Sequence, residues 1–524
     1  MKINYTIKNK NTRRLTSPQS LNAYIKSICD IMRRSGRASA LQYVPELTWM
    51  LFLRILDERE EKEEEQAKAL GIKFTPSLGY PYRWQDWAAL SGKKRKELQE
   101  GTLGAFMSFV NGELIPYLRN LKNKPGATPR QKIISEVFSF TERTHIDTER
   151  NLLDILDKID TLSLESIDET HMFPISQVYE GLLQKMGEKN NDGGQFFTPR
   201  EVIRAMVKVI DPEIGETVYD PCCGTGGFLA QAYQHMKEKA KTASDIETLK
   251  TRTFYGREKE NLVYPIVLAN LVLQEIDEPH IWHGNTLTGL EVYGGLFHDA
   301  PGLFDVVLTN PPFGGKEGKD AQTKFAYKTG ATQVLFLQHV IDSLKPGGRC
   351  GIVMDEGVLF RTNENAFVQT KRKLLNECNL WCIISLPPRI FLNAGAASKT
   401  NLLFFTRGEP TKEIWYYDLS DLNITKKQPL TIEHFEEFFK LMDEEFGMKN
   451  RDIPQSEIKI QQSSWRSWRV SVEEIVAKNY DLKAVNPNRK EKGDTRTPQE
   501  LLSIIELQSD EIKNILSLLR KREI

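Results

Sequence analysis

The chain has 524 residues, which is too long for a single hydrophobic core and predicts about three domains. Its 71 basic and 71 acidic residues cancel, which excludes a uniformly basic nucleic-acid binder and leaves either segregated charge or help from a partner. No apolar run approaches membrane-spanning length, no signal peptide is recognised, and the six cysteines have no zinc-like pairing with histidines. We therefore expect a cytoplasmic protein with reduced thiols, no metal and no membrane partner.

The first 165 residues are predicted to be helical. Residues 21–28 and 47–56 place apolar side chains at spacings of three and four, the pattern of a buried helix face. From about residue 170 to 408, strand-length apolar runs alternate with helical patterns, which predicts a doubly wound α/β sheet. We expect an N-terminal helical domain over residues 1–165 and an α/β domain over 166–410.

Beyond residue 410 the pattern weakens. We expect a C-terminal extension over residues 411–486, with one strand and an acidic helix, and a polar linker over 487–498. Residues 499–524 are predicted to form a helix with one apolar stripe, which favours docking of a partner; folding back onto its own domain is the alternative. The stripe comprises Leu501, Ile505, Ile512, Ile515 and Leu519.

The first candidate binding segment precedes a predicted helix that ends at Ile210. Thr198 suits an N-cap, with Pro199 at the first helical position. Such a helix end offers free N–H groups and a positive dipole, to which a carboxylate or an adenosyl group could bind; an ordinary capped helix is the alternative. The segment comprises Gln195, Phe196, Phe197, Thr198, Pro199 and Arg200.

A glycine-rich turn, Pro221–Phe228, follows the predicted strand Thr217–Asp220. Glycines at this position, here Gly224 and Gly226 around Thr225, let a ligand approach the backbone closely. A phosphate-binding loop is disfavoured, because no Lys-Ser/Thr pair follows the glycines and Asp220 would repel phosphate but attract an ammonium group.

Two further polar residues follow predicted strands. Glu258 ends the strand Thr253–Glu258, where an acidic side chain can accept hydrogen bonds from ribose hydroxyls; a solvated surface glutamate is the alternative. Asn285 lies in the strand and turn Ile281–Leu287, where it could bind an adenine edge or simply form the turn.

The segment Asn310-Pro311-Pro312-Phe313 follows the apolar strand Phe304–Leu308. Two prolines cannot continue a strand ladder, since neither has an N–H, and Pro311 holds Asn310 out of the helical region. The result is a stiff elbow at the carboxyl end of a strand, where open α/β sheets bind ligands. The glycine- and lysine-rich residues 314–330 then predict a mobile loop over this site.

The elbow suits an exocyclic amine on a planar ring. Asn310 Oδ1 and the Pro311 carbonyl can both accept from an NH₂ group, and Phe313 can stack on the ring. A nucleobase would have to flip out of a duplex to reach such a pocket. Taken alone, Asn-Pro-Pro-Phe is equally compatible with an ordinary proline-rich turn.

Together these motifs resemble a known family. Residues 220–228 followed by Asn310–Phe313 resemble the amino-group DNA methyltransferases, and residues 194–200 narrow the resemblance to the methylase (modification) subunit of type I restriction-modification systems. The resemblance implies a Rossmann-like, S-adenosylmethionine-dependent methyltransferase fold over 166–410, with the helical N-terminal domain and a helical tail. It also implies direct methyl transfer to adenine N6 in duplex DNA, which protects host DNA from cleavage, without a metal.

The resemblance further assigns residues and partners. It implies that Asn310–Phe313 hold the flipped adenine, and that Asp220 faces the methionine end of the cofactor. The implied partners are double-stranded DNA, a specificity subunit, a second copy of the methylase subunit and a restriction subunit. Cys222 and Cys223 depart from the small residues usual in the family's glycine turn, and Asn285 stands where relatives often carry Asp. The implied cofactor contacts are Gln195, Phe196, Phe197, Thr198, Pro199, Arg200, Asp220, Gly224, Thr225, Gly226, Glu258 and Asn285.

Two alternatives stay open at this point. Asn-Pro-Pro-aromatic elbows also serve amino-group methyltransferases that act on protein glutamine or on RNA. A binding module that has kept the fold and lost turnover is the other alternative, although an intact Asp220, Gly226, Asn310 and Phe313 disfavours it.

Overall fold

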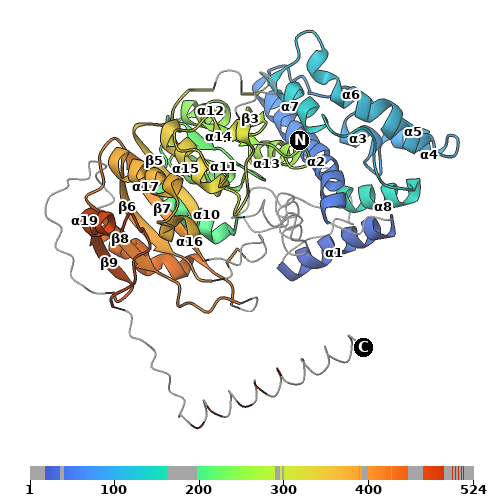
Figure 1. The fold of residues 1–524 in the computed structure, drawn as a ribbon. Helices are drawn as coiled ribbons and strands as arrows, with labels where there is room; N and C mark the ends of the chain where they lie inside the picture. The colour runs from blue at the N-terminus through green and yellow to red at the C-terminus, as the bar shows by residue number, and fades with distance from the viewer. Residues whose placement is uncertain are drawn as a thin grey trace.

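The structure, a computed structural model, describes most of the chain (Figure 1). The described residues are 18–35, 40–161, 198–288, 296–297, 300–388, 390–391, 399–425, 428–446, 464–488 and the single residues Gln499, Leu502, Glu506, Ser509 and Ile512. Gln195, Phe196, Phe197 and most of the predicted tail helix therefore lie outside the described residues. In the part of the chain that is described, no helix is long and apolar enough to cross a membrane.

The N-terminal residues form a helical domain. The longest helix, α2, is apolar in its first half, where Trp49 and Phe52 are buried, and charged in its second half, as the sequence pattern predicts. Trp84 and Trp87 are fully buried beside it. The helices are α1 Pro18–Arg34, α2 Ala40–Leu70, α3 Trp84–Trp87, α4 Lys93–Gln99, α5 Ala105–Phe109, η1 Val110–Leu114, α6 Ile115–Arg119, η2 Leu121–Asn123, α7 Pro129–Val137 and α8 Glu149–Asp160.

A single sheet of nine strands organises the rest of the described chain, in the order β3-β2-β1-β4-β5-β7-β6-β8-β9. Seven strands run in one direction, and β7 and β9 run opposite to them. The predicted doubly wound sheet is confirmed. The strands are β1 Val218–Asp220, β2 Phe254–Glu258, β3 His280–His283, β4 Phe304–Thr309, β5 Leu344–Asp355, β6 Cys378–Ser385, β7 Thr400–Arg407, β8 Glu413–Asp418 and β9 Ser467–Ser471.

Helices cover both faces of the sheet. Successive residues of a strand point to opposite faces, and the residues on both faces are apolar. In β7, Leu402 and Phe404 pack into one core with α10, α11, α13 and α18, whereas Leu403 and Phe405 pack into a second core with α15 and α17. The helices are α10 Arg200–Ile210, α11 Gly227–Lys237, α12 Ala243–Thr251, α13 Tyr264–Leu273, α14 Lys319–Gln322, α15 Thr332–Ser343, α16 Glu356–Phe360, α17 Asn365–Glu377, η5 Ile432–Phe435, α18 Glu436–Phe446 and α19 Val472–Ala477.

The helical domain packs on the sheet through α13, which lies against α2 and α7 (Figure 1). Helix α13 is apolar nearly all round because it is buried between these helices and the sheet. At its end, Asp277 pairs with Arg59 of α2, and with Arg130 of α7 at 3.6 Å. The two parts therefore share both an apolar contact and an ion-pair network.

Two sequence predictions need correction, and one strand was missed. Helix α10 begins at Arg200 with Pro199 as N-cap and no side-chain cap, so Thr198 is not the N-cap. The predicted mobile loop, residues 314–330, is folded: it contains α14, and both ends of the Gln338 amide bind the backbone of Tyr327. Strand β8 confirms the strand predicted within residues 411–486, and β9, which was not predicted, extends the sheet further.

Candidate active site

The candidate site lies at one edge of the sheet, where β2, β1 and β4 end side by side. These strands are neighbours and parallel, so their carboxyl ends meet at the same edge. Glu258 ends β2, Asp220 ends β1, and Asn310 follows β4 directly. Strand order thus gathers residues that lie far apart in the sequence.

Asp220 joins the glycine turn to the neighbouring strand. Its Oδ1 accepts from Thr309 Oγ1 at 2.7 Å and from the Cys222 N–H at 3.2 Å. The side chain is buried, and this burial raises the pKa of Asp220 to about 7 despite both hydrogen bonds. Thr309, which sequence reasoning did not single out, also lies 3.0 Å from Cys222 Sγ.

The glycine turn is fixed by packing as well as by backbone conformation. Gly226 has a φ of +82°, and a Cβ at this position would lie 2.9 Å from Val267 Cγ2 of α13. Glycine is therefore required here for close packing on α13 and not only for ligand approach. Cys222 and Cys223 pack into two different apolar clusters, and burial raises the pKa of both thiols, which keeps them protonated.

Glu258 is buried, so the surface alternative for this residue is wrong. Its Oε2 accepts from the Gly224 N–H at 2.9 Å, and its Oε1 accepts from the Glu260 N–H at 2.8 Å. Burial raises the pKa of Glu258 to about 7. The carboxylate thereby fixes the glycine turn from the β2 side, while its remaining lone pairs can accept from a ligand.

Asn310 has one half of its amide engaged and the other half free. Nδ2 donates to Thr198 Oγ1 at 2.9 Å, which ties the elbow to the segment before α10. Oδ1 is buried and has no hydrogen-bond partner among the described residues. A buried acceptor without a partner costs roughly 1–3 kcal/mol, and a donor from a ligand would offset this cost.

Phe313 lies at the border of the core, half-buried, and not in its interior. Its ring meets the ring of Phe391 edge-on, with centroids 5.4 Å apart and an interplanar angle of 67°. Phe391 was not predicted, because it follows β6 and is distant from the elbow in sequence. The two rings form an aromatic corner beside Asn310 that suits a planar ligand.

The residues that follow β3 lie beside the glycine turn. Asn285 Oδ1 accepts from the Leu287 N–H at 3.0 Å, which is the geometry of a turn-forming asparagine. Thr286 Oγ1 donates to the Pro221 carbonyl and joins this turn to the glycine turn. Leu287 packs with residues of α14 and α15, including Ala321 and Phe336. These contacts favour the turn-forming interpretation of Asn285.

Arg200, at the start of α10, is largely buried. Burial, with a smaller contribution from Arg204, lowers the pKa of Arg200 to about 10, so the guanidinium stays charged at neutral pH. It lies two residues along the chain from Thr198, whose hydroxyl contacts Asn310.

A doubly wound sheet with acidic groups ending two strands, a glycine turn between them and an amide elbow on the next strand defines a Rossmann-like, amino-group methyltransferase. The N-6 DNA Methylase family matches residues 171–496, and the HsdM N-terminal domain family matches residues 21–159. The chain belongs to the type I restriction enzyme methylase subunits of the N-6 DNA methylase family, and it is an adenine-specific DNA methyltransferase.

Comparison with individual relatives supports the same family assignment. The chain is 35% identical to the EcoEI methylase subunit of Escherichia coli over 96% of this chain and 97% of that protein. It is 30% identical to the StySPI methylase subunit of Salmonella potsdam over 80% and 75%, respectively. A chain in a solved type I restriction-modification assembly is 39% identical, with a TM-score of 0.71 and coverage of 96% and 98%. These relatives give no support to a protein or RNA substrate.

Proposed function

We propose that this chain transfers a methyl group from S-adenosylmethionine to N6 of an adenine extruded from duplex DNA, with Asn310–Phe313 holding the base. The observation that carries the proposal is the buried Oδ1 of Asn310 after β4, which has no partner in the part of the chain that the structure describes. An adenine amino group supplies the donor that this oxygen lacks. When bound, S-adenosylmethionine supplies an already activated, electrophilic methyl group.

The residues present fit that cofactor. Glu258 holds its carboxylate against the glycine turn and has spare lone pairs for ribose hydroxyls. The two hydrogen bonds that we observe on Asp220 both end on Oδ1, which leaves Oδ2 for an ammonium group. Because Asp220 is desolvated, a cation beside it would stabilise the ionised form and lower its pKa. These two carboxylates therefore suit a zwitterionic nucleoside, whose ammonium group and ribose hydroxyls are donors.

Asn310 would act by orientation. The amide is neutral and cannot serve as a strong base, so the displaced proton leaves to solvent after transfer. With Nδ2 donating to Thr198, Oδ1 is left to accept from the amino group together with the Pro311 carbonyl. Two acceptors draw the nitrogen toward tetrahedral geometry and expose its lone pair. Alignment with reacting atoms about 3–3.5 Å apart then supplies most of the acceleration.

The aromatic corner would hold the ring. Phe313 can stack on an extruded adenine while Phe391 meets its edge, since the two rings are already close to perpendicular. Stacking of this kind contributes roughly 1–3 kcal/mol per base, comparable to the cost of flipping the base from a duplex.

Substitution of Asn310 tests the proposal. Asn310→Ala is expected to abolish tritiated-methyl transfer to duplex DNA while S-adenosylmethionine binding, measured by calorimetry, stays within a few-fold. Asn365→Ala, at an exposed asparagine of α17, is the matched control and should leave both unchanged. Retained methyl transfer by Asn310→Ala would overturn the role of the elbow, and equal loss of cofactor binding would indicate misfolding.

We also propose the partners that the family organisation implies. The balanced charge favours a separate specificity subunit for base reading, joined by a second methylase copy and a restriction subunit. The solved assembly that contains a similar chain supports this arrangement. Co-purification with the products of neighbouring genes, followed by mapping of methylated adenines, tests it; residues 499–524 remain the candidate contact.

A further inference from the structure

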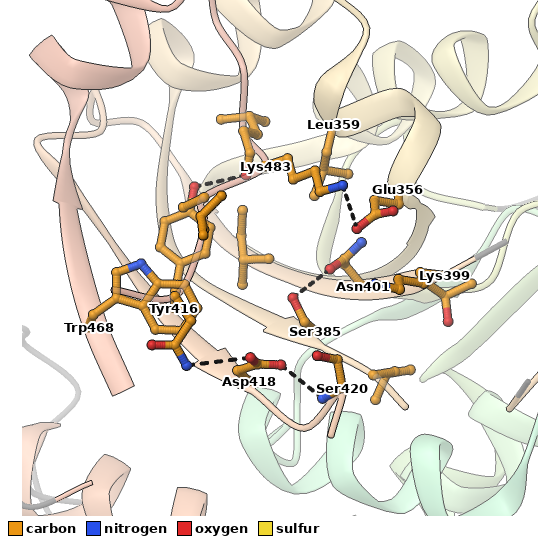
Figure 2. A pocket seen from close by; sticks show the side chains of 17 residues that line it. Glu356, Leu359, Ser385, Lys399, Asn401, Tyr416, Asp418, Ser420, Trp468 and Lys483 are labelled. Carbon is orange, nitrogen blue, oxygen red and sulfur yellow. Dashed lines mark hydrogen bonds and ion pairs between the residues drawn. The ribbon is translucent and has the colours of Figure 1, made fainter. Parts of the chain in front are cut away.

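A cavity of about 150 Å³ lies at the same edge of the sheet as the active site, but several strands away (Figure 2). Strands β5, β6 and β8 run parallel, so Asp355, Ser385 and Asp418 end them at one edge. The residues of 482–486 and the start of α16 close the cavity from above. Carboxyl-end crevices of this kind are where open α/β sheets bind ligands.

Asn401 provides the main polar group of the cavity. Only 4% of the residue is exposed, and its Oδ1 accepts from Ser385 Oγ at 2.9 Å. Its Nδ2 is buried and has no partner among the described residues. Figure 2 shows the amide in the middle of the lining side chains, with its oxygen toward Ser385. Two N–H groups in a buried position thus lack an acceptor.

Trp468 and Tyr416 form an aromatic wall of the cavity. Trp468 Nε1 is buried and likewise lacks a partner in the described part of the chain. The Trp468 ring stacks on the Tyr416 ring, with centroids 5.4 Å apart and an interplanar angle of 14°. The Tyr416 hydroxyl donates a hydrogen bond to the Leu482 carbonyl. The indole is therefore held in place and presents a flat apolar surface.

The charges that line the cavity balance. Glu356 pairs with Lys483 at 3.3 Å, and Asp418 Oδ1 accepts from the Ser420 N–H at 2.8 Å. With Lys399 at the rim, two acidic and two basic side chains line the site. An added charge would not be compensated, so an uncharged acceptor fits better than a carboxylate or a phosphate.

The remaining lining is apolar and restricts the size of the occupant. Leu359, Ile383 and Leu482 are almost fully buried at the cavity. A cavity of this volume accommodates a single six-membered ring. We propose that it binds an uncharged, pyrimidine-sized ring with a carbonyl oxygen that accepts from Asn401 Nδ2.

Calorimetric titration of the full chain with uracil tests the proposal. We expect saturable binding, weakened about ten-fold in Asn401→Leu, since this change removes the donor. Trp468→Phe, which keeps an aromatic ring against Tyr416, should change the affinity by less than about three-fold. Asn365→Leu, at an exposed position, is the matched control and should bind uracil as the native chain does. Circular dichroism unfolding identifies a variant that does not fold; Asn401→Asp, which keeps the shape and removes the NH₂, then replaces Asn401→Leu.

Further experiments distinguish this cavity from the active site. They also distinguish a free ring from one that belongs to a nucleic-acid strand. Asn310→Ala should leave uracil binding unchanged, and 5-bromouracil soaked into crystals should place its bromine beside Asn401. Binding of uracil alone assigns a free molecule, whereas binding of short oligothymidylate as well assigns a nucleic-acid strand. Absence of uracil binding, equal affinity for benzene, preference for benzoate, or bromine at Phe313 would each overturn the proposal.

Discussion

Asn310 Nδ2 donates to Thr198 Oγ1 at 2.9 Å, across 112 positions of sequence. This contact engages the NH₂ end of the amide and leaves Oδ1 for the base. Without it, the amide could rotate and present its NH₂ group to the amino group of the base, where donor would meet donor.

Thr198→Val, which keeps the side-chain shape and removes the acceptor, should therefore lower the rate of methyl transfer about ten- to hundred-fold in single-turnover assays. The affinity for S-adenosylmethionine should change by less than about three-fold, since a single neutral contact is lost. Thr198→Ser restores the hydroxyl and should recover most of the rate. A slow Ser variant would show that the methyl group of Thr198, not its hydroxyl, is what the elbow needs.

The buried carboxyl groups predict how stability depends on pH. Asp220 and Glu258 have folded-state pKa values of about 7, above their ordinary values of 3.8 and 4.5. Between about pH 4 and 7 the folded state therefore binds more protons than the unfolded state, and stability without ligand falls as pH rises through this range. Asp220→Asn, which can still accept from Thr309, should raise the melting temperature at pH 8 and change it little at pH 4.

Cofactor affinity should follow the opposite trend. Ionised Asp220 and Glu258 are the forms that accept from a ligand, so the affinity for S-adenosylmethionine should fall as pH drops below about 7. Calorimetry from pH 5.5 to 8.5 measures this dependence. A flat profile in the native chain would contradict a role for either carboxylate in binding.

The elbow was predictable from sequence because its cause is local: Pro311 and Pro312 lack N–H groups and must end a strand wherever it lies. The apolar runs of β1, β2 and β4 were predictable for the same reason. The contact of Thr309 with Asp220 was not, because it joins residues 89 positions apart and depends on β4 lying beside β1. Phe391 was missed likewise, since only the fold brings its ring to Phe313.

The strand β9, Ser467–Ser471, was missed for a different reason. It is a short edge strand whose residues are mostly half-buried, so it lacks a strong apolar run, and it pairs only with β8. The Thr198 N-cap was predicted from the local sequence pattern, and in the structure its hydroxyl contacts Asn310 instead. Local propensity cannot reveal a tertiary partner that competes for the same side chain.

Asp277 should be a main electrostatic link between the helical domain and the sheet. Its carboxylate forms ion pairs with Arg59 of α2, Arg130 of α7 and Lys250 of α12. Asp277→Asn should destabilise the chain by about 2 kcal/mol, because partly buried cations lose their counter-charge. Urea denaturation measures the loss. Asp443→Asn, at an exposed position of α18, is the matched control and should change stability by less than about 0.5 kcal/mol.

Gly226 offers the sharpest test of how the glycine turn is held. Gly226→Ala adds two costs: a side chain at φ +82°, and a Cβ 2.9 Å from Val267 Cγ2. Gly215 has a φ of +96°, and nothing lies within 4 Å of the place that a Cβ would take, so Gly215→Ala carries the backbone cost alone. We expect about 1–2 kcal/mol of destabilisation for Gly215→Ala and roughly a further 1–3 kcal/mol for Gly226→Ala from overpacking. Only Gly226→Ala should also weaken S-adenosylmethionine binding, because relief of the clash moves the turn away from Glu258. Equal unfolding free energies for the two variants would show that α13 yields to the added methyl group and that packing does not fix the turn.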